Sequence, residues 1–219
     1  MPPDRKKPAS ARRRAKRLDP SERRPQLMRC ALRVFARRGL GAARHSEIAR
    51  EAKVSVPTVF FYFPTRDALV KAVLDEVARF LTDMTIEVHA SSAPAPDIVL
   101  AHAKAFADSV DTQPDYARVW LDWSTAMREE IWPLYLEFQE NIVGIIANTI
   151  CRWQRERGLA DTAAEDDARL IVGSAHMIAQ MKFTRVAPEK VDHFLRELVR
   201  ATLGAAPGRS DSESSAESG

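Results

Sequence analysis

Apolar residues recur along nearly the whole chain at spacings of three and four residues, the period of an amphipathic α-helix. From Pro20 onward, Leu27, Ala31 and Phe35 follow one another at intervals of four. This pattern ends at Arg37-Arg38-Gly39, where two basic residues and a glycine suit the last turn of a helix and the position after it. No run of residues has the two-residue alternation of a convincing strand, and no internal repeat is present. The sequence therefore predicts an all-α protein.

Two very short helical patterns follow between residues 44 and 63, with a tight turn at Lys53-Val54-Ser55 between them. Their apolar positions are Ile48, Ala49 and Ala52 in the first, and Val59, Phe60 and Phe63 in the second. Ser55 is a suitable N-cap for the second helix, and Pro57 lies in its first turn, where a missing N–H costs little. A helix of about two turns is not stable alone in water, so neighbours must hold it in place. The arrangement predicts a helix-turn-helix whose second helix enters the DNA major groove.

Longer helical patterns fill the chain up to residue 203. Thr65 caps a helix that runs to about Val88, and small residues and prolines from Ser91 to Pro96 predict a linker. The remaining predicted helices are Asp97 to about Thr112, about Tyr116–Met127, Trp132 to Arg157-Gly158, about Thr162–Thr184, and Pro188–Leu203. Residues 1–19 and 204–219 have disordered compositions.

Charge is distributed unevenly along the chain. Residues 1–66 contain 18 Lys and Arg against 5 Asp and Glu, whereas the rest of the chain contains 15 against 25. Such a division is typical of a module that binds a polyanion, joined to a body that does not. A disordered basic tail explains part of the excess, but not Arg44, Arg50, Lys53 and Arg66 around the two short helices.

Other classes of protein find little support in the sequence. The five histidines have no metal-ligand spacing, and neither a nucleophile elbow nor a glycine-rich phosphate loop is present, so we expect no enzyme, metal or cofactor. Cys30 and Cys151 lack CxxC spacing and are interpreted as reduced packing residues. No apolar run reaches about 18 residues and no signal peptide is evident, which predicts a cytoplasmic protein that does not bind a membrane.

The segment RHSEIAREAKVSVPTVFFYFPTRDALV resembles the TetR family of transcription factors in its Ile-Ala pair, Val-Ser turn, aromatic residues and Phe-Pro step. A narrower resemblance, over roughly residues 18–140, is to the LuxR/HapR-type master regulators of quorum sensing in vibrios. It lies in QLMRCALRVFARRGLG, VSVPTVFFYFPTRDALV and RVWLDWSTAMREEIWPLYLE. The chain departs from that subfamily at Phe61, where Asn is usual, and at Pro57, where Ala is common. Because Phe cannot hydrogen-bond a base, we expect a different preference for the target sequence.

The resemblance implies a set of DNA contacts. Arg66, Lys53, and Tyr62 or Ser55 are the expected phosphate contacts, and His45 is expected to contact a phosphate or to cap its helix. Base readout falls to Val56, Pro57, Thr58 and Phe61, none of which can make a bidentate contact. Arg14 and Arg17 in the arm are candidates for insertion into a narrow minor groove. The alternative, a solvated run of charge that only raises nonspecific affinity, stays open.

The resemblance also implies a homodimer built through the last two helices. The expected interface residues are Leu170, Ala175, Ile178, Met181, Val191, Leu195 and Leu198. A cavity for a small apolar ligand is expected in the body, although an aromatic stripe at helical spacing is also ordinary core packing. The expected lining residues are Phe80, Leu81, Met84, Trp120, Trp123, Met127, Phe138 and Asn141.

Together these features predict four parts: a basic arm at 1–19, a DNA-binding domain at 20–66, a ligand-pocket and dimerisation domain at 67–203, and a tail at 204–219. The function expected is that of a quorum-sensing type regulator that binds a pseudo-palindromic operator in double-stranded DNA. Two alternatives are a local repressor of an efflux or catabolic operon that a ligand releases, and a nonspecific nucleoid-associated protein.

Overall fold

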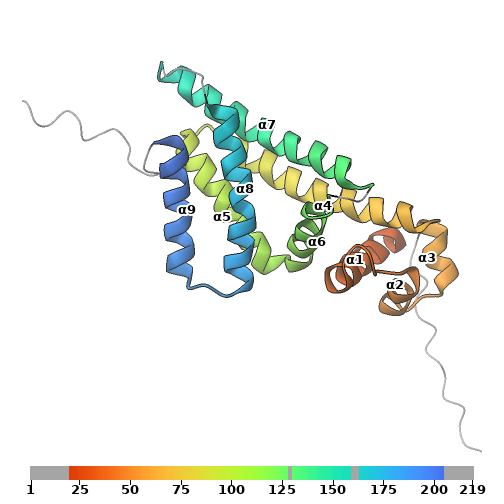
Figure 1. Ribbon diagram of the computed structural model, residues 1–219. Coiled ribbons are helices and arrows are strands. Elements are labelled where there is room, and N and C mark those ends of the chain that lie inside the picture. The colour runs from red at the N-terminus through yellow and green to blue at the C-terminus, as the bar shows by residue number, and fades with distance from the viewer. Residues whose placement is uncertain (1–19, 128–129, 159–162, 205–219) are drawn as a thin grey trace, which may run out of the picture.

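The computed structural model describes residues 20–127, 130–158 and 163–204, which form nine α-helices and no strand (Figure 1). The all-α class predicted from the sequence is confirmed. The helices are α1 Pro20–Arg38, α2 His45–Ala52, α3 Val56–Tyr62, α4 Arg66–His89, α5 Ala95–Thr112, α6 Pro114–Ser124, α7 Trp132–Glu156, α8 Ala164–Phe183 and α9 Pro188–Leu203. The predicted arm at 1–19 and nearly all of the predicted tail lie outside the described residues.

The helix ends follow local backbone chemistry. Gly39 closes α1 with a φ of +79° and donates its N–H to the Phe35 carbonyl at 2.8 Å. Ser55 caps α3 by accepting the Thr58 N–H at 3.3 Å, and Thr65 caps α4 by accepting the Ala68 N–H at 3.0 Å. Each cap satisfies one of the N–H groups that the first turn of a helix leaves without a partner.

Two helices, α5 and α6, differ in their boundaries from the sequence prediction. Helix α5 begins at Ala95 rather than Asp97, because Pro96 fits the first turn and does not extend the linker. Helix α6 begins at Pro114 for the same reason, and it ends at Ser124 rather than at Met127. The start and end of α9 are as predicted.

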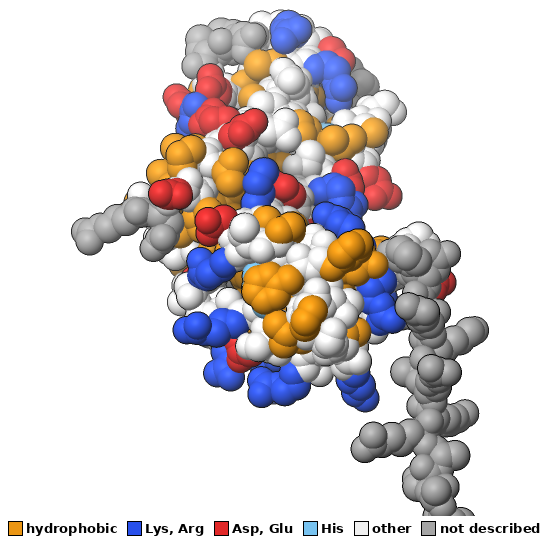
Figure 2. Space-filling model, turned by 90° about the vertical axis from the view of Figure 1, so that its right-hand side faces the viewer, with side chains coloured by type: hydrophobic (Ala, Val, Ile, Leu, Met, Phe, Trp, Pro, Cys, Tyr) orange, Lys and Arg blue, Asp and Glu red, His pale blue; other side chains and the backbone are white. Residues whose placement is uncertain are grey.

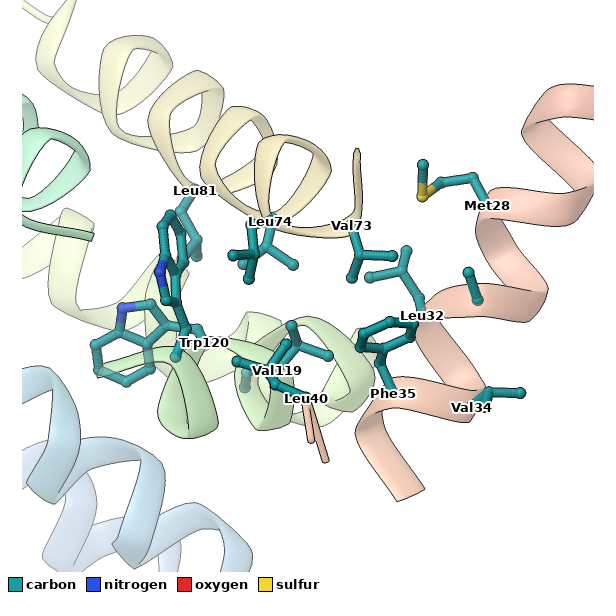
Figure 3. Close-up of a cluster of buried hydrophobic side chains, with 14 of the residues drawn as sticks. Met28, Leu32, Val34, Phe35, Leu40, Val73, Leu74, Leu81, Val119 and Trp120 are labelled. Atoms are coloured by element: carbon teal, nitrogen blue, oxygen red, sulfur yellow. The ribbon is translucent and has the colours of Figure 1, made fainter. Parts of the chain in front are cut away.

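One hydrophobic core joins the N-terminal helices to the body. Phe35 and Leu40 lie against Val119 of α6, and Leu74 of α4 lies beside them (Figure 3). The same cluster continues to Trp120 and Leu81. Packing is therefore continuous across the boundary expected at residue 66.

The long helices set the distance between the two ends of the molecule. Helix α4 starts beside α3 and runs into the body, where α7 packs alongside it (Figure 1). Helices α8 and α9 pack against each other at the end opposite α2 and α3. Within the described ranges, no helix has the length and apolar character needed to span a membrane.

Candidate nucleic-acid interface and interior cavity

The outer face of α3 is apolar and exposed. Phe61 is 79% exposed and Phe60 is 45% exposed, and Val56 and Pro57 are exposed beside them. Figure 2 shows apolar side chains gathered over this end of the molecule, with Lys and Arg side chains around them. A grouped apolar surface with a polar rim is typical of a surface that another molecule covers.

The hydroxyl groups of the turn are partly used within α3. Ser55 Oγ and Thr58 Oγ1 lie 2.8 Å apart and share a hydrogen bond. At the turn, the Lys53 backbone adopts the left-handed conformation, with a φ of 55°, and the Lys53 side chain is exposed. Tyr62 is half-buried and packs edge-to-face on Phe61, with ring centroids 5.1 Å apart. The predicted contact residues Ser55, Thr58, Lys53 and Tyr62 thus lie together around Phe61 on α3 and its turn.

His45 has a different role from the one predicted. Its side chain is buried, its ring stacks on Phe60 with centroids 4.1 Å apart, and Nε2 lies 2.8 Å from the Phe63 carbonyl oxygen. Because a carbonyl only accepts, Nε2 donates. The expectation that the His45 ring contacts a phosphate is therefore corrected: the ring is enclosed and holds α3 against the start of α2.

Arg66 supports the loop between α1 and α2. Its guanidinium donates to the carbonyls of Leu40 at 2.6 Å and Gly41 at 3.0 Å. The N–H of Leu40 in turn donates to Asp122 Oδ2 on α6 at 2.5 Å. The Leu40 residue is thus held through both its backbone groups. Arg66 remains an exposed residue, so a phosphate contact stays a prediction.

Several arginines that contribute to the basic excess are paired inside the N-terminal unit. Arg33 and Arg37 both bind Glu51, at 3.0 and 3.1 Å, and Arg38 binds Glu47 at 2.8 Å. These pairs connect α1 to α2. The local charge that faces a polyanion is therefore smaller than composition alone indicates. Arg14 and Arg17, the predicted minor-groove residues, lie outside the described residues.

A cavity of about 50 Å³ lies in the body, between α4, α5, α6, α7 and α8. Of the eight residues predicted to line a pocket, Leu81, Met84, Trp120 and Phe138 do so. The rest of the lining is mostly aliphatic and aromatic, and its largest further members are Phe106, Tyr135, Ile142, Ile146, Ile171 and Ile178.

The other four predicted lining residues lie elsewhere. Trp123 is buried in the core and donates its Nε1–H to the Ile131 carbonyl at 3.1 Å. Phe80 packs on Tyr116, with ring centroids 4.3 Å apart. Met127 and Asn141 are exposed. The prediction is corrected for these four residues, because helical spacing located the apolar side of each helix but not the neighbour that covers it.

The polar wall of the cavity was not predicted. His102, which is only 9% exposed, lines the cavity, and its Nδ1 lies 2.9 Å from His89 Nε2. His89 Nδ1 lies 2.8 Å from Thr149 Oγ1. The hydrogen bonds thus run from Thr149 through His89 to His102. This chain, hereafter the histidine relay, connects α7, α4 and α5.

Burial governs the charge of the relay. It lowers the pKa of His89 to about 4, with a further contribution from the nearby Arg152 guanidinium. It lowers the pKa of His102 to about 3, and repulsion from His89 adds to this effect. Both imidazoles are therefore neutral near pH 7. A sequence signal existed, since His102 falls on the apolar stripe of α5 with Val99 and Phe106.

The face of α8 and α9 also differs in part from the prediction. Ile178, Val191 and Leu195 are buried in the core of the single chain, and Ala175 lines the cavity. These four residues are corrected from interface to interior. Leu170 is 62% exposed and Met181 and Leu198 are half-buried, as a contact surface requires. Met177, which is 47% exposed, was missed.

Metal chemistry has no evident place in the part of the chain that the structure describes, where no group of three or more His, Cys, Asp or Glu side chains could hold an ion. The site thus consists of an exposed aromatic helix at one end and a mostly apolar cavity in the body.

Known proteins resemble this chain in sequence. Residues 27–73 match the pattern of bacterial regulatory proteins of the tetR family. The chain is 34% identical over 198 residues to the HTH-type transcriptional regulator LuxR of Vibrio harveyi, covering 88% of this chain and 93% of that protein.

Solved structures share the fold at lower identity. A TetR-like transcriptional regulator from Rhodococcus sp. RHA1 superposes with a TM-score of 0.71 at 17% identity, covering 86% of this chain and all of that one. The regulator FadR from Bacillus subtilis, solved in complex with stearoyl-CoA, gives 0.68 at 14% identity, with 82% and 97% covered. The chain belongs to the TetR family of DNA-binding bacterial transcriptional regulators.

Proposed function

We propose that this regulator acts as a homodimer of the LuxR/HapR quorum-sensing type and reads a pseudo-palindromic operator through the apolar face of α3. The observation that carries the proposal is Phe61, a large aromatic side chain that is 79% exposed at the centre of that face. The 34% identity to LuxR over 93% of its length supports the quorum-sensing type over other TetR regulators. Such a protein acts on DNA in the cytoplasm and is not an enzyme.

The dimer is supported by the far end of the molecule. Leu170 and Met177 are seven residues apart on α8, so they lie on one side of that helix, and both are exposed. Leu198 on α9 and Met181 on α8 are half-buried. A two-fold axis through this face joins the chains and leaves α3 of each chain open to DNA. Two recognition helices then meet two half-sites, which a single short helix could not do with high specificity.

Base readout is expected to be apolar. Thr58 has a hydroxyl that can bond a base edge, whereas Val56, Pro57 and Phe61 can pack only against thymine methyl groups. Arg14 and Arg17 are proposed to add shape readout from the minor groove. Lys53, Ser55, Tyr62 and Arg66 are proposed to contact phosphates, which position the protein and carry no sequence information.

The test begins with the full chain and a random DNA library, from which bound sequences are selected. Thymines in the recovered half-site are then replaced one at a time by deoxyuridine, which removes only the methyl group. We expect a loss of about fivefold or more at one or two positions, within the range of a base contact. Phe61→Ala should abolish this sensitivity to uracil. Ile86→Ala, which removes an exposed apolar side chain from α4, is the matched control and should leave binding unchanged.

Three results would contradict the proposal at different levels. Equal affinity for selected and random DNA, with the same dependence on salt, would favour a nonspecific DNA-organising protein. Selective binding that no uracil substitution weakens would retain the regulator and remove apolar readout. Sedimentation of a complex with one chain per operator would contradict the dimer.

A local repressor released by a ligand is the second candidate, and the interior cavity is the observation that favours it. Mapping of bound sites across the genome separates the two functions. Many sites whose occupancy changes with cell density support the quorum-sensing type. A single site beside the regulator's own gene supports the local repressor.

A further inference from the structure

The geometry points to a ligand site at the polar wall of the cavity, which takes a small, mostly apolar molecule through one uncharged hydroxyl or carbonyl group that binds His102 Nε2. This inference deepens the proposed function, since it rests on the cavity serving a regulator. It names the chemical class of the effector and the atom that selects it.

His102 is held so that one ring nitrogen is committed and the other is not. Nδ1 is bonded to His89, and the described residues offer Nε2 no further hydrogen-bond partner. The side chain is more than nine-tenths buried and belongs to the cavity wall. Because no described side chain or carbonyl bonds Nε2, a ligand oxygen in the cavity can bond it without displacing a protein group.

Two hydroxyl groups on the wall are already used within the protein. Thr85 Oγ1 donates to the Leu81 carbonyl at 2.8 Å, and Ser174 Oγ donates to the Ile171 carbonyl at 2.6 Å. Gln139 is only half-buried, so water can solvate it. Trp120 Nε1–H can only donate, whereas His102 Nε2 can either donate or accept, so His102 is the group that suits both a hydroxyl and a carbonyl ligand.

The histidine relay has two neutral proton arrangements. When Thr149 donates to His89 Nδ1, His89 Nε2 donates to His102 Nδ1, and His102 Nε2–H can donate to a carbonyl. When Thr149 instead donates to the Ile145 carbonyl, 3.4 Å away, every bond in the relay reverses and His102 Nε2 accepts from a hydroxyl. Either oxygen group therefore fits the same site.

Charged groups do not fit it. The described lining contains no Lys, Arg, Asp or Glu, and both histidines are neutral near pH 7. A carboxylate placed there would lose its hydration without gaining a countercharge. The cavity of about 50 Å³ is far smaller than the usual ligand pocket of about 300–1,000 Å³, so binding must widen it. Met84, flexible and half-buried on the wall, is suited to move.

The experiment uses the full-length protein at pH 7 and four ring compounds of similar size as probes: cyclohexanol, cyclohexanone, methylcyclohexane and cyclohexanecarboxylate. Binding is measured by calorimetry. The alcohol and the ketone should each bind about tenfold more tightly than the hydrocarbon, the value of one well-made hydrogen bond, and the carboxylate should bind most weakly.

The variant His102→Asn sharpens the test. Its amide occupies the place of Nδ1 and keeps the bond to His89, but the atom that faces the ligand is absent. The tenfold preference should vanish while methylcyclohexane binds as before. His193→Asn, at an exposed position on α9, is the matched control and should retain the preference.

A readout without any substitution guards against a variant that does not fold. The ¹⁵N signal of His102 Nε2 should move in opposite directions when the alcohol and the ketone bind, because the nitrogen accepts in one case and donates in the other. Equal binding of all four probes, tightest binding of the carboxylate, or no binding of any probe would overturn the inference. None of these results would affect the operator test, so failure here is distinguishable from failure of the proposed function.

Discussion

Aromatic side chains serve opposite purposes on α3 and on α6. On α3, Phe60 and Phe61 are exposed, whereas on α6 Trp120 and Trp123 are buried. Burial of a large apolar side chain contributes several kcal/mol to folding, and an exposed one contributes almost nothing. Aromatic residues therefore have two roles here. The tryptophans stabilise the body, whereas Phe61 contributes only when another molecule covers it.

The largest change in the free energy of unfolding should come from removing a tryptophan of the body. Trp123→Ala deletes a buried ring and its hydrogen bond to Ile131, so the free energy of unfolding should fall by about 3–5 kcal/mol. Phe61→Ala should change it by less than about 0.5 kcal/mol. Urea titration of both variants measures the difference, and similar losses would refute the contrast.

The connection between the two regions should be the next most sensitive point. Asp122→Ala leaves the Leu40 N–H without its acceptor, and we expect a loss of about 1–3 kcal/mol in unfolding free energy. Asp108→Ala, at an exposed position on α5, is the control. If Asp122→Ala costs no more than this control, the bond between α6 and the α1–α2 loop has no stabilising role.

Acid should weaken the body through the histidine relay. The unfolded chain has histidines with a pKa near 6.5, while His89 and His102 have values of about 4 and 3 in the fold. Between these values the unfolded chain binds more protons, so stability falls as the pH falls below 6.5. The loss should approach about 1.4 kcal/mol per pH unit for each histidine, or about 2 kcal/mol each at pH 5. In denaturation curves from pH 7 to 5, His102→Asn should be less steep than the wild type; an unchanged slope would contradict this origin.

The smallest effect should come from the exposed ion pairs of the N-terminal unit. Glu51→Gln frees Arg33 and Arg37, and should cost less than about 1 kcal/mol, since solvated pairs contribute little. The freed charges should steepen the dependence of DNA affinity on salt. A slope equal to that of the wild type would show that these arginines lie outside the DNA contact.

How far the sequence predicts this protein depends on the scale of the feature. The all-α class and every described helix follow from periodicity and capping. Ser55 and Thr65, for example, are the N-caps of α3 and α4, as local rules require. The starts of α5 and α6 were predicted too late in the sequence, because prolines expected in the preceding linkers lie in the first turns of these helices.

Side-chain roles were harder to predict, because periodicity assigns a face but not the neighbour that covers it. Ile178 and Leu195 lie on apolar faces, and these turn toward the core of the same chain rather than toward a partner. His45 is the first residue of a helix at the expected DNA face, yet its ring is covered by Phe60 and bonded to the Phe63 carbonyl. His89 and His102 are 13 residues apart in sequence and meet only because α4 and α5 pack together.

The hydrogen bond between the Leu40 N–H and Asp122 also makes the Leu40 amide a spectroscopic probe of the position of α6. Asp122 is two residues from Trp120, which lines the cavity, so a small rotation of α6 alters both. The Leu40 amide proton, 2.5 Å in donor–acceptor distance from a carboxylate, should resonate at an unusual frequency that shifts with this distance. Nuclear magnetic resonance could therefore follow events in the cavity from a single amide beside the DNA-binding helices, before any DNA is added.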